Sequence, residues 1–124
     1  QVPLYPGTGA PAERGAHGPV VNVALAPGSG GDEARAAWAA ICDRVAAWRP
    51  QLVLVSAGFD AHAADPLASL MWDEADFTAI TRMICDTAAA CSAPVVSALE
   101  GGYDLAALGR SARAHVDVLR ETAA

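Results

Sequence analysis

The chain has 124 residues, 53% of them hydrophobic, and carries a net charge of −6. This length and hydrophobic content suffice for one compact domain and exclude a disordered segment. The acidic balance argues against direct nucleic-acid binding, which needs clustered basic residues, and no apolar run approaches the ~20 residues that span a membrane.

The first segment, residues 1–19, holds four prolines and four glycines, which predicts an irregular loop and not a core element. Loops of this length are often functional. The chain begins with Gln1 instead of Met, and no signal peptide follows. We therefore expect a fragment, an artificially shortened chain or a processed product.

A strand and a helix are predicted next. Residues 20–25 form a short apolar strand with β-branched side chains, and the glycine-rich residues 27–31 end it. Asp32 is the expected cap of a helix that runs to about Trp48, where Pro50 stops it. Apolar residues recur along this helix at three- and four-residue steps, at Ala34, Trp38, Ile41, Val45 and Trp48.

A second unit of the same kind follows. Residues 52–57 form a nearly continuous apolar run, which is typical of a strand buried on both faces of a parallel sheet. A loop occupies residues 58–72. Asp73 then caps a second helix, whose apolar side contains Phe77, Ile80 and Ile84.

The third unit comprises a strand at residues 95–99, a loop at residues 100–103 and a last helix. That helix has an apolar face formed by Leu105, Leu108, Ala112, Val116 and Leu119. The order βαβαβα predicts an α/β fold with a parallel sheet and right-handed connections. Because three strands leave two open sheet edges, we expect further structure upstream or self-association through an edge.

Polar residues gather just after the second predicted strand. Ligands of parallel sheets bind beyond the carboxyl ends of the strands, and Asp60, His62 and Asp65 follow this strand closely. A carboxylate here is placed to ligate a metal or act as a base. The alternative is an Asp that caps backbone N–H groups of the loop. The Asp60–His62 pair could offer two ligands, although a loop histidine is more often not a ligand.

The loop after the third strand reads Glu100-Gly101-Gly102-Tyr103. A glycine pair lets the backbone approach a ligand or adopt a positive φ. The Tyr103 hydroxyl could then face a developing oxyanion. The alternative is a tight turn with a half-buried tyrosine.

The glycines at 28, 30 and 31 lie between a strand and a helix, as in a phosphate-binding loop. However, Glu33 stands where the dinucleotide pattern needs its last glycine, and the chain has no lysine for a Walker loop. Asp32 and Glu33 would also repel a phosphate at that helix start. A nucleotide-binding α/β module of unrelated function therefore remains only a weak alternative.

The three cysteines, Cys42, Cys85 and Cys91, lie in predicted helices among apolar residues, and no pair has metal-site spacing. This favours buried free thiols and a cytoplasmic location. All eight basic residues are arginine, which we attribute to a GC-rich bacterial genome. His115, in the last helix, is expected at the surface or on the flank of that helix.

Four segments together resemble the family of histone deacetylases and acetylpolyamine amidohydrolases. S-A-G-F-D-A-H at 56–62 with D-P-L at 65–67 is similar to a segment of class II-type and bacterial members. L-E-G-G-Y at 99–103 and Y-P-G-T-G at 5–9 resemble two further motifs. V-N-V-A-L at 21–25 resembles the N-V-P-L strand, with Ala24 where proline is usual. The match covers nearly the whole chain, in the same order and spacing.

The resemblance implies a three-layer arginase–deacetylase fold and zinc-dependent hydrolysis of an N-acetyl amide on acetylated lysine or a polyamine. By position, Asp60 matches a zinc ligand and Tyr103 the tyrosine that hydrogen-bonds the oxyanion. Gly101 and Gly102 match glycines beside the substrate channel. Tyr5 and Leu67 match wall positions of the acyl-lysine tunnel, so the resemblance implies that residues 1–19 form an active-site loop. Asp65 matches an acidic residue whose expected role is structural, and His62 matches no ligand.

The resemblance also implies that parts of the active site lie upstream of this chain. These are the other two metal ligands, an Asp and a His, and the His pair that serves as general base and acid. The chain is therefore expected to be the C-terminal portion of one deacetylase domain, inactive in isolation. The alternative is a non-catalytic fragment that binds or complements a deacetylase.

Overall fold

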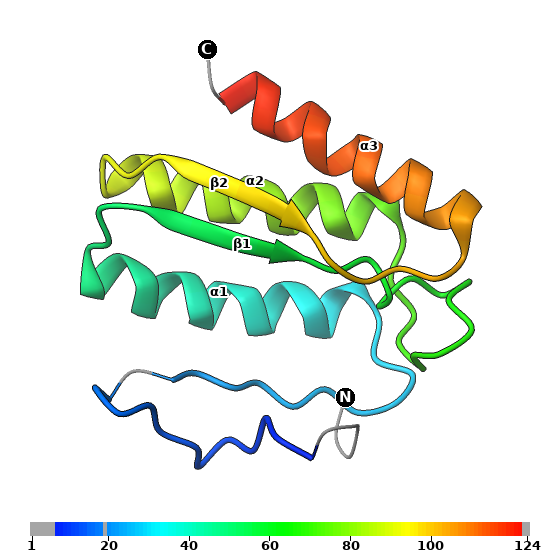
Figure 1. The fold of residues 1–124 in the computed structure, drawn as a ribbon, viewed down its shortest axis with the longest axis horizontal. Coiled ribbons are helices and arrows are strands. Elements are labelled where there is room, and N and C mark those ends of the chain that lie inside the picture. The colour runs from blue at the N-terminus through cyan, green and yellow to red at the C-terminus, as the bar shows by residue number, and fades with distance from the viewer. Residues whose placement is uncertain (1–6, 19, 123–124) are drawn as a thin grey trace.

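The computed structural model describes residues 7–18 and 20–122. In chain order the elements are α1 (Gly31–Trp48), β1 (Val53–Ala57), α2 (Glu74–Ala90), β2 (Val95–Leu99) and α3 (Leu105–Thr122). The strands pair in parallel, with Val53 opposite Val95 and Ala57 opposite Leu99. Both strands point the same way, so the loops that follow them lie at the same end of the sheet (Figure 1). The strand–helix order of the second and third predicted units is confirmed.

The strand predicted at residues 20–25 was wrong, because this segment pairs with no strand in the described part of the chain. It runs extended beside α1 (Figure 1), and Val21 borders a hollow with Ile41, Val45 and Trp48 of that helix. An apolar β-branched run becomes a strand only where another strand completes its hydrogen bonds. The observed order is therefore αβαβα and not βαβαβα. Residues 7–18 are irregular, as predicted.

All three helices pack on one face of the sheet. Val53 and Val55 of β1 contact Ala34 of α1 and Ile80 of α2, together with neighbouring apolar side chains. Ser97 of β2 points to the same face, because it pairs with Val55, and it hydrogen-bonds α3. The core thus lies between the two strands and a single helical layer.

The opposite face of the sheet is bare. Side chains alternate across a strand, so Leu54 and Val96 point away from the helices. Leu54 is 69% exposed and Val96 is 53% exposed. The prediction that residues 52–57 are buried on both faces is therefore wrong for the described residues, which form two layers.

Acidic side chains occupy the start of α1. The cap position is Gly30 and not Asp32, which lies in the first turn. The Gly30 N–H donates to Glu33 Oε2 at 3.0 Å. A Cβ at Gly31 would overlap the Asp76 carboxylate, so glycine is required there. With this helix start filled by carboxylates, the nucleotide-binding alternative loses its site.

His115 is buried, so the expectation of a surface position was wrong. Its Nδ1 lies 2.8 Å from Thr81 Oγ1, and its Nε2 lies 2.8 Å from Ser97 Oγ. Because Thr81 donates its hydroxyl proton to the Phe77 carbonyl, it must accept from His115 Nδ1–H. The neutral ring therefore accepts from Ser97 and links α2, β2 and α3. Burial lowers the pKa of His115 below its ordinary value.

We expect the protein to lose stability as the pH falls below about 6.5, because unfolded His115 binds a proton there and the buried ring resists it. The contribution of neutral His115 to the free energy of unfolding is fully present above that pH. It declines as the pH falls toward the lowered pKa of the folded protein. His115→Phe should flatten this dependence between pH 7.5 and 5. At pH 7.5 the variant should be about 1–3 kcal/mol less stable, since the hydroxyls of buried Thr81 and partly buried Ser97 lose their hydrogen bond to the ring. Urea unfolding across this range measures both effects, and equal slopes for the two proteins would contradict the assignment.

The cysteines are free, as predicted, with Cys85 buried and Cys42 and Cys91 partly buried. Across residues 7–18 and 20–122, no helix has the length and apolar character needed to cross a membrane.

Candidate active site

The two loops that follow β1 and β2 are held together by backbone hydrogen bonds beyond the strands. The Glu100 N–H donates to the Ala57 carbonyl at 3.0 Å, and the Phe59 N–H donates to the Gly101 carbonyl at 2.9 Å. The parallel ladder is thereby extended into both loops. The motifs around Asp60 and Tyr103, about forty positions apart in the sequence, consequently meet at the carboxyl end of the sheet.

The Asp60 carboxylate lies in a space that two glycines leave open. A Cβ at Gly101 would stand 3.0 Å from Asp60 Oδ2, and one at Gly58 would stand 3.0 Å from Asp60 Oδ1. Asp60 is half-buried. Within the described residues, no hydrogen bond or ion pair reaches its carboxylate. It therefore does not cap the loop, and its oxygens are available to an external partner.

Gly102 and Tyr103 form the other side of this end of the sheet. Gly102 has φ +129°, and a Cβ there would come within 2.9 Å of Leu108 Cδ1, so only glycine fits without strain. Tyr103 is 55% exposed, and no described residue hydrogen-bonds its hydroxyl. The Tyr103 side chain is thus exposed and its hydroxyl has no described partner, whereas the tight-turn alternative expects a half-buried tyrosine.

Asp65 and Leu67 lie in the loop between β1 and α2. Asp65 is buried, and its Oδ2 accepts a hydrogen bond from the Tyr103 N–H at 2.8 Å. Leu67 is exposed, as a wall position would be before a partner covers it. Tyr5, the other predicted wall residue, lies outside the described residues.

His62 is directed toward α2. Its Nδ1 accepts from the Ala64 N–H at 3.0 Å, so the proton of the neutral ring is on Nε2. That Nε2 lies 3.5 Å from Glu74 Oε1. Arg110 also pairs with Glu74 and lowers the pKa of that carboxyl group. Both ring nitrogens therefore face groups other than Asp60, which does not favour the interpretation of His62 as a second ligand beside it.

Asp60 is the one candidate metal ligand that the described residues place at this end of the sheet. In the part of the chain that the structure describes, no three His, Cys, Asp or Glu side chains gather as a metal cluster. A zinc site needs three protein ligands and a water. The open Asp60 carboxylate fits the role of one ligand, and the described residues alone do not complete the set.

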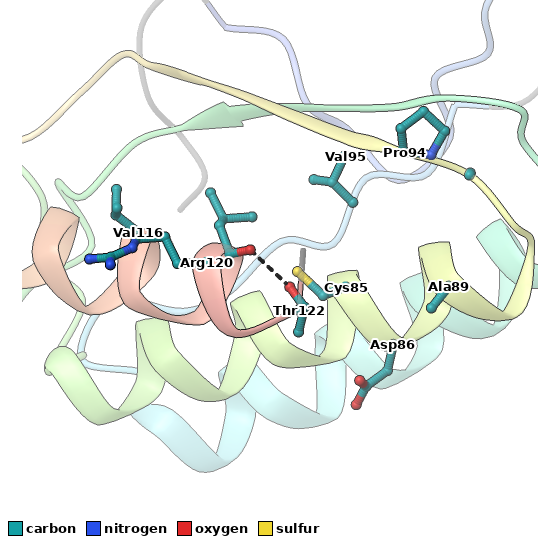
Figure 2. Close-up of a pocket in the computed structure, with 10 residues that line it drawn as sticks. Cys85, Asp86, Ala89, Pro94, Val95, Val116, Arg120 and Thr122 are labelled. Carbon is teal, nitrogen blue, oxygen red and sulfur yellow. Dashed lines mark hydrogen bonds between the residues drawn. The ribbon is translucent and has the colours of Figure 1, made fainter. Parts of the chain in front are cut away.

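A cavity of about 700 Å³ lies at the other end of the sheet, away from the loops that carry Asp60 and Tyr103. Figure 2 shows it between α2, α3 and the start of β2, with Cys85 on one wall and Arg120 on another. Its lining is mostly apolar. Since it is at the amino end of β2, it is separate from the strand-end loops.

Comparison with known proteins assigns the family. The model of the histone deacetylase domain matches residues 1–119 of the chain. The chain belongs to the histone deacetylase domain family. The crystal structure of the HDA15 HD domain superposes with a TM-score of 0.82 at 34% identity, over 94% of this chain and 34% of that one. The predicted family and its arginase–deacetylase fold are thereby confirmed.

Deacetylases similar to this chain occur in organisms as different as Dictyostelium discoideum and Archaeoglobus fulgidus. The type-2 histone deacetylase 1 of Dictyostelium discoideum is 40% identical over 84% of the chain and 7% of its own length. A probable deacetylase of Archaeoglobus fulgidus is 36% identical over 85% of the chain and 31% of its own length. The chain thus spans about a third or less of these relatives.

Proposed function

We propose that this chain supplies part of the active site of a zinc-dependent deacetylase that hydrolyses N-acetyl amides. The observation that carries the proposal is the half-buried Asp60 carboxylate, which has no described protein partner and lies against Gly58 and Gly101. Tyr103 follows the neighbouring strand at the same end of the sheet. A carboxylate and a phenol at the same end of the sheet, neither bonded by a described residue, suit the activation of an amide carbonyl.

Each residue has a distinct task in this proposal. Asp60 is one of three metal ligands, and the other two belong to the rest of the domain. The bound zinc would polarise the amide carbonyl and activate a water. The Tyr103 hydroxyl donates a hydrogen bond to the oxygen on which negative charge develops. Gly101 and Gly102 lie beside the substrate channel, and Tyr5 and Leu67 form its apolar walls.

The proposed substrates are acetylated lysine in a protein and an acetylated polyamine. A histone tail and a polyamine are both cationic, and the net charge of −6 would attract them weakly. Three free cysteines agree with a reducing compartment, and we propose a cytoplasmic location.

Acetate release from an acetyl-lysine peptide and an acetylpolyamine tests the proposal. The chain alone should show no turnover, because its described residues hold no three-ligand group. Joined to the rest of a deacetylase domain, it should release acetate, and a chelator should stop the reaction. Turnover by the isolated chain would overturn the division of the site. A complete domain that binds zinc but never releases acetate would overturn the deacetylase assignment.

A second candidate function is that of a non-catalytic fragment that complements or occupies a deacetylase. The bare sheet face with Leu54 and Val96 favours it, because exposed apolar faces mark interaction sites. Co-expression with an N-terminal deacetylase portion should then yield a stable pair without activity. Self-association of the chain, seen by light scattering, would instead indicate that two copies cover each other's sheets.

Gly101→Ala should reduce the activity of the complete domain by about 10-fold with little change in stability. The new Cβ would stand 3.0 Å from both Asp60 Cγ and Oδ2, so the carboxylate must shift by a few tenths of an ångström. Such a shift should cost less than the ~100-fold loss in rate that a misplacement near 1 Å brings. Gly109→Ala in α3 is the matched control, since nothing lies within 4 Å of its Cβ. Steady-state kinetics and zinc content measure the effect, and equal activity of the two variants would contradict it.

A further inference from the structure

Asp65 makes two kinds of contact, and the first is local. Its Oδ1 accepts from the Leu67 N–H at 2.9 Å and from the Ala68 N–H at 3.2 Å. Such bonds, two and three residues along the chain, are what an aspartate makes in a turn. They explain the shape of the loop after Asp60, and they use only one of the two carboxylate oxygens.

The second contact crosses to the other strand-end loop. Asp65 Oδ2 accepts from the Tyr103 N–H at 2.8 Å, 38 residues away in the sequence. Asp65 is 8% exposed, so water does not substitute readily for these partners. The carboxylate thus ties the loop that carries Asp60 to the backbone that carries Tyr103.

The charge of Asp65 strengthens this tie. Burial alone would raise the pKa of Asp65, but hydrogen bonds from the N–H groups of Leu67, Tyr103 and two neighbouring residues lower it below its ordinary value. The side chain is therefore ionised at neutral pH. Hydrogen bonds to a charged acceptor are about twice as strong as neutral ones.

The Tyr103 side chain has no comparable anchor of its own. It is more than half exposed, and no described residue binds its hydroxyl. The direction of the phenol consequently depends on its backbone, which Gly102 turns through a positive φ and Asp65 holds at the amide.

We propose that Asp65 is a positioning residue that fixes the Tyr103 backbone, so that the phenol is presented to the oxyanion beside the Asp60 ligand. The inference rests on the proposed deacetylase function. It extends that function by giving Asp65 a role that the spacing of the motif does not indicate. Asp65 itself touches neither substrate nor metal in this proposal.

The test is a double-mutant cycle in the complete domain with Asp65→Asn and Tyr103→Phe. An asparagine keeps the shape but brings an NH₂ group against one of the N–H groups that Asp65 accepts from. Asp65→Asn should lower kcat by about 10–100-fold, as partners of active-site groups do, with KM within threefold and zinc content unchanged. In the Tyr103→Phe background the same change should add less than threefold. An equal loss in both backgrounds would show that Asp65 does not act through the phenol.

Asp73→Asn is the matched control. Asp73 also accepts a backbone N–H, from Asp76 at 3.0 Å, at the start of α2, and asparagine caps a helix as well as aspartate. It should leave kcat within twofold and show no coupling to Tyr103→Phe. Coupling as large as that of Asp65 would mean that the cycle reports general loosening and would overturn the proposal.

Amide hydrogen exchange separates this inference from the proposed function. In the unmodified domain the Tyr103 amide should exchange slowly, at a rate comparable to that of the Leu67 amide, and Asp65→Asn should speed it at least tenfold. If the domain never deacetylates but exchange behaves in this way, the function fails and the Asp65–Tyr103 link stands. If the domain is active but the Tyr103 amide is unprotected, the link fails alone. Should Asp65→Asn not fold, the rate in the unmodified domain still decides.

Discussion

Replacement of Asp60 by asparagine should lower the zinc content and the deacetylase activity of the complete domain by more than 100-fold. Outer partners of metal ligands cost 10–100-fold when removed, and a direct ligand should cost more. Stability without metal should barely change, because the carboxylate has no described hydrogen-bond partner to lose. Metal analysis after dialysis, together with initial rates, measures both quantities.

Asp32→Asn is the control for this experiment. Asp32 is an exposed carboxylate in the first turn of α1, and among the described residues it pairs with Arg35 alone, so zinc content and rate should stay within twofold. Zinc should raise the unfolding temperature of the unmodified domain and of this control, since a ligand stabilises the fold that binds it. It should not do so for Asp60→Asn. Retained zinc and a rate within tenfold in Asp60→Asn would remove Asp60 from the ligand set.

Local patterns in the sequence were sufficient for the elements that form their own contacts. The helix face with Phe77, Ile80 and Ile84 is buried as its spacing indicates, and Asp73 caps that helix. The strand at 95–99 has the bounds expected of it. These features depend on hydrogen bonds and periodicity within about four residues, which the sequence displays directly.

The errors concern contacts between distant parts of the chain. The segment 20–25 has the composition of a strand, but a strand also needs a neighbour, and composition does not say whether one is available. His115 looks like a surface residue in an amphipathic helix. Its two nitrogens are hydrogen-bonded by Thr81 and Ser97, which lie 34 and 18 positions away in the sequence and meet the ring only in the folded chain.

The candidate site shows the same division. The motif spacing predicted that Asp60 and Tyr103 lie at strand ends, and topology brings those ends together. The motif spacing did not indicate that Gly58 and Gly101 both border the Asp60 carboxylate. Nor did it indicate that Asp65 accepts a hydrogen bond from the Tyr103 amide. These facts depend on the register of two parallel strands, which no single segment of the sequence specifies.

Tyr103→Phe should lower kcat of the complete domain by about 10²–10³-fold, the usual loss for an oxyanion donor, with KM changed by less than threefold. The phenol should act only as charge develops on the carbonyl oxygen, so its removal affects the transition state more than substrate binding. Because no described residue hydrogen-bonds the hydroxyl, the fold should be as stable as before. Steady-state rates with an acetyl-lysine peptide and thermal unfolding measure these effects.

A trifluoroacetyl substrate tests the oxyanion role of Tyr103 directly, because its more reactive carbonyl needs less help from a hydrogen-bond donor. The loss in Tyr103→Phe should therefore shrink on this substrate, whereas the loss in Asp60→Asn, which removes metal, should persist. The variant should also keep its zinc, since the Tyr103 hydroxyl is not part of the ligand set. A large rise in KM with kcat unchanged would instead make Tyr103 a wall of the substrate channel and leave the oxyanion without a donor from this chain.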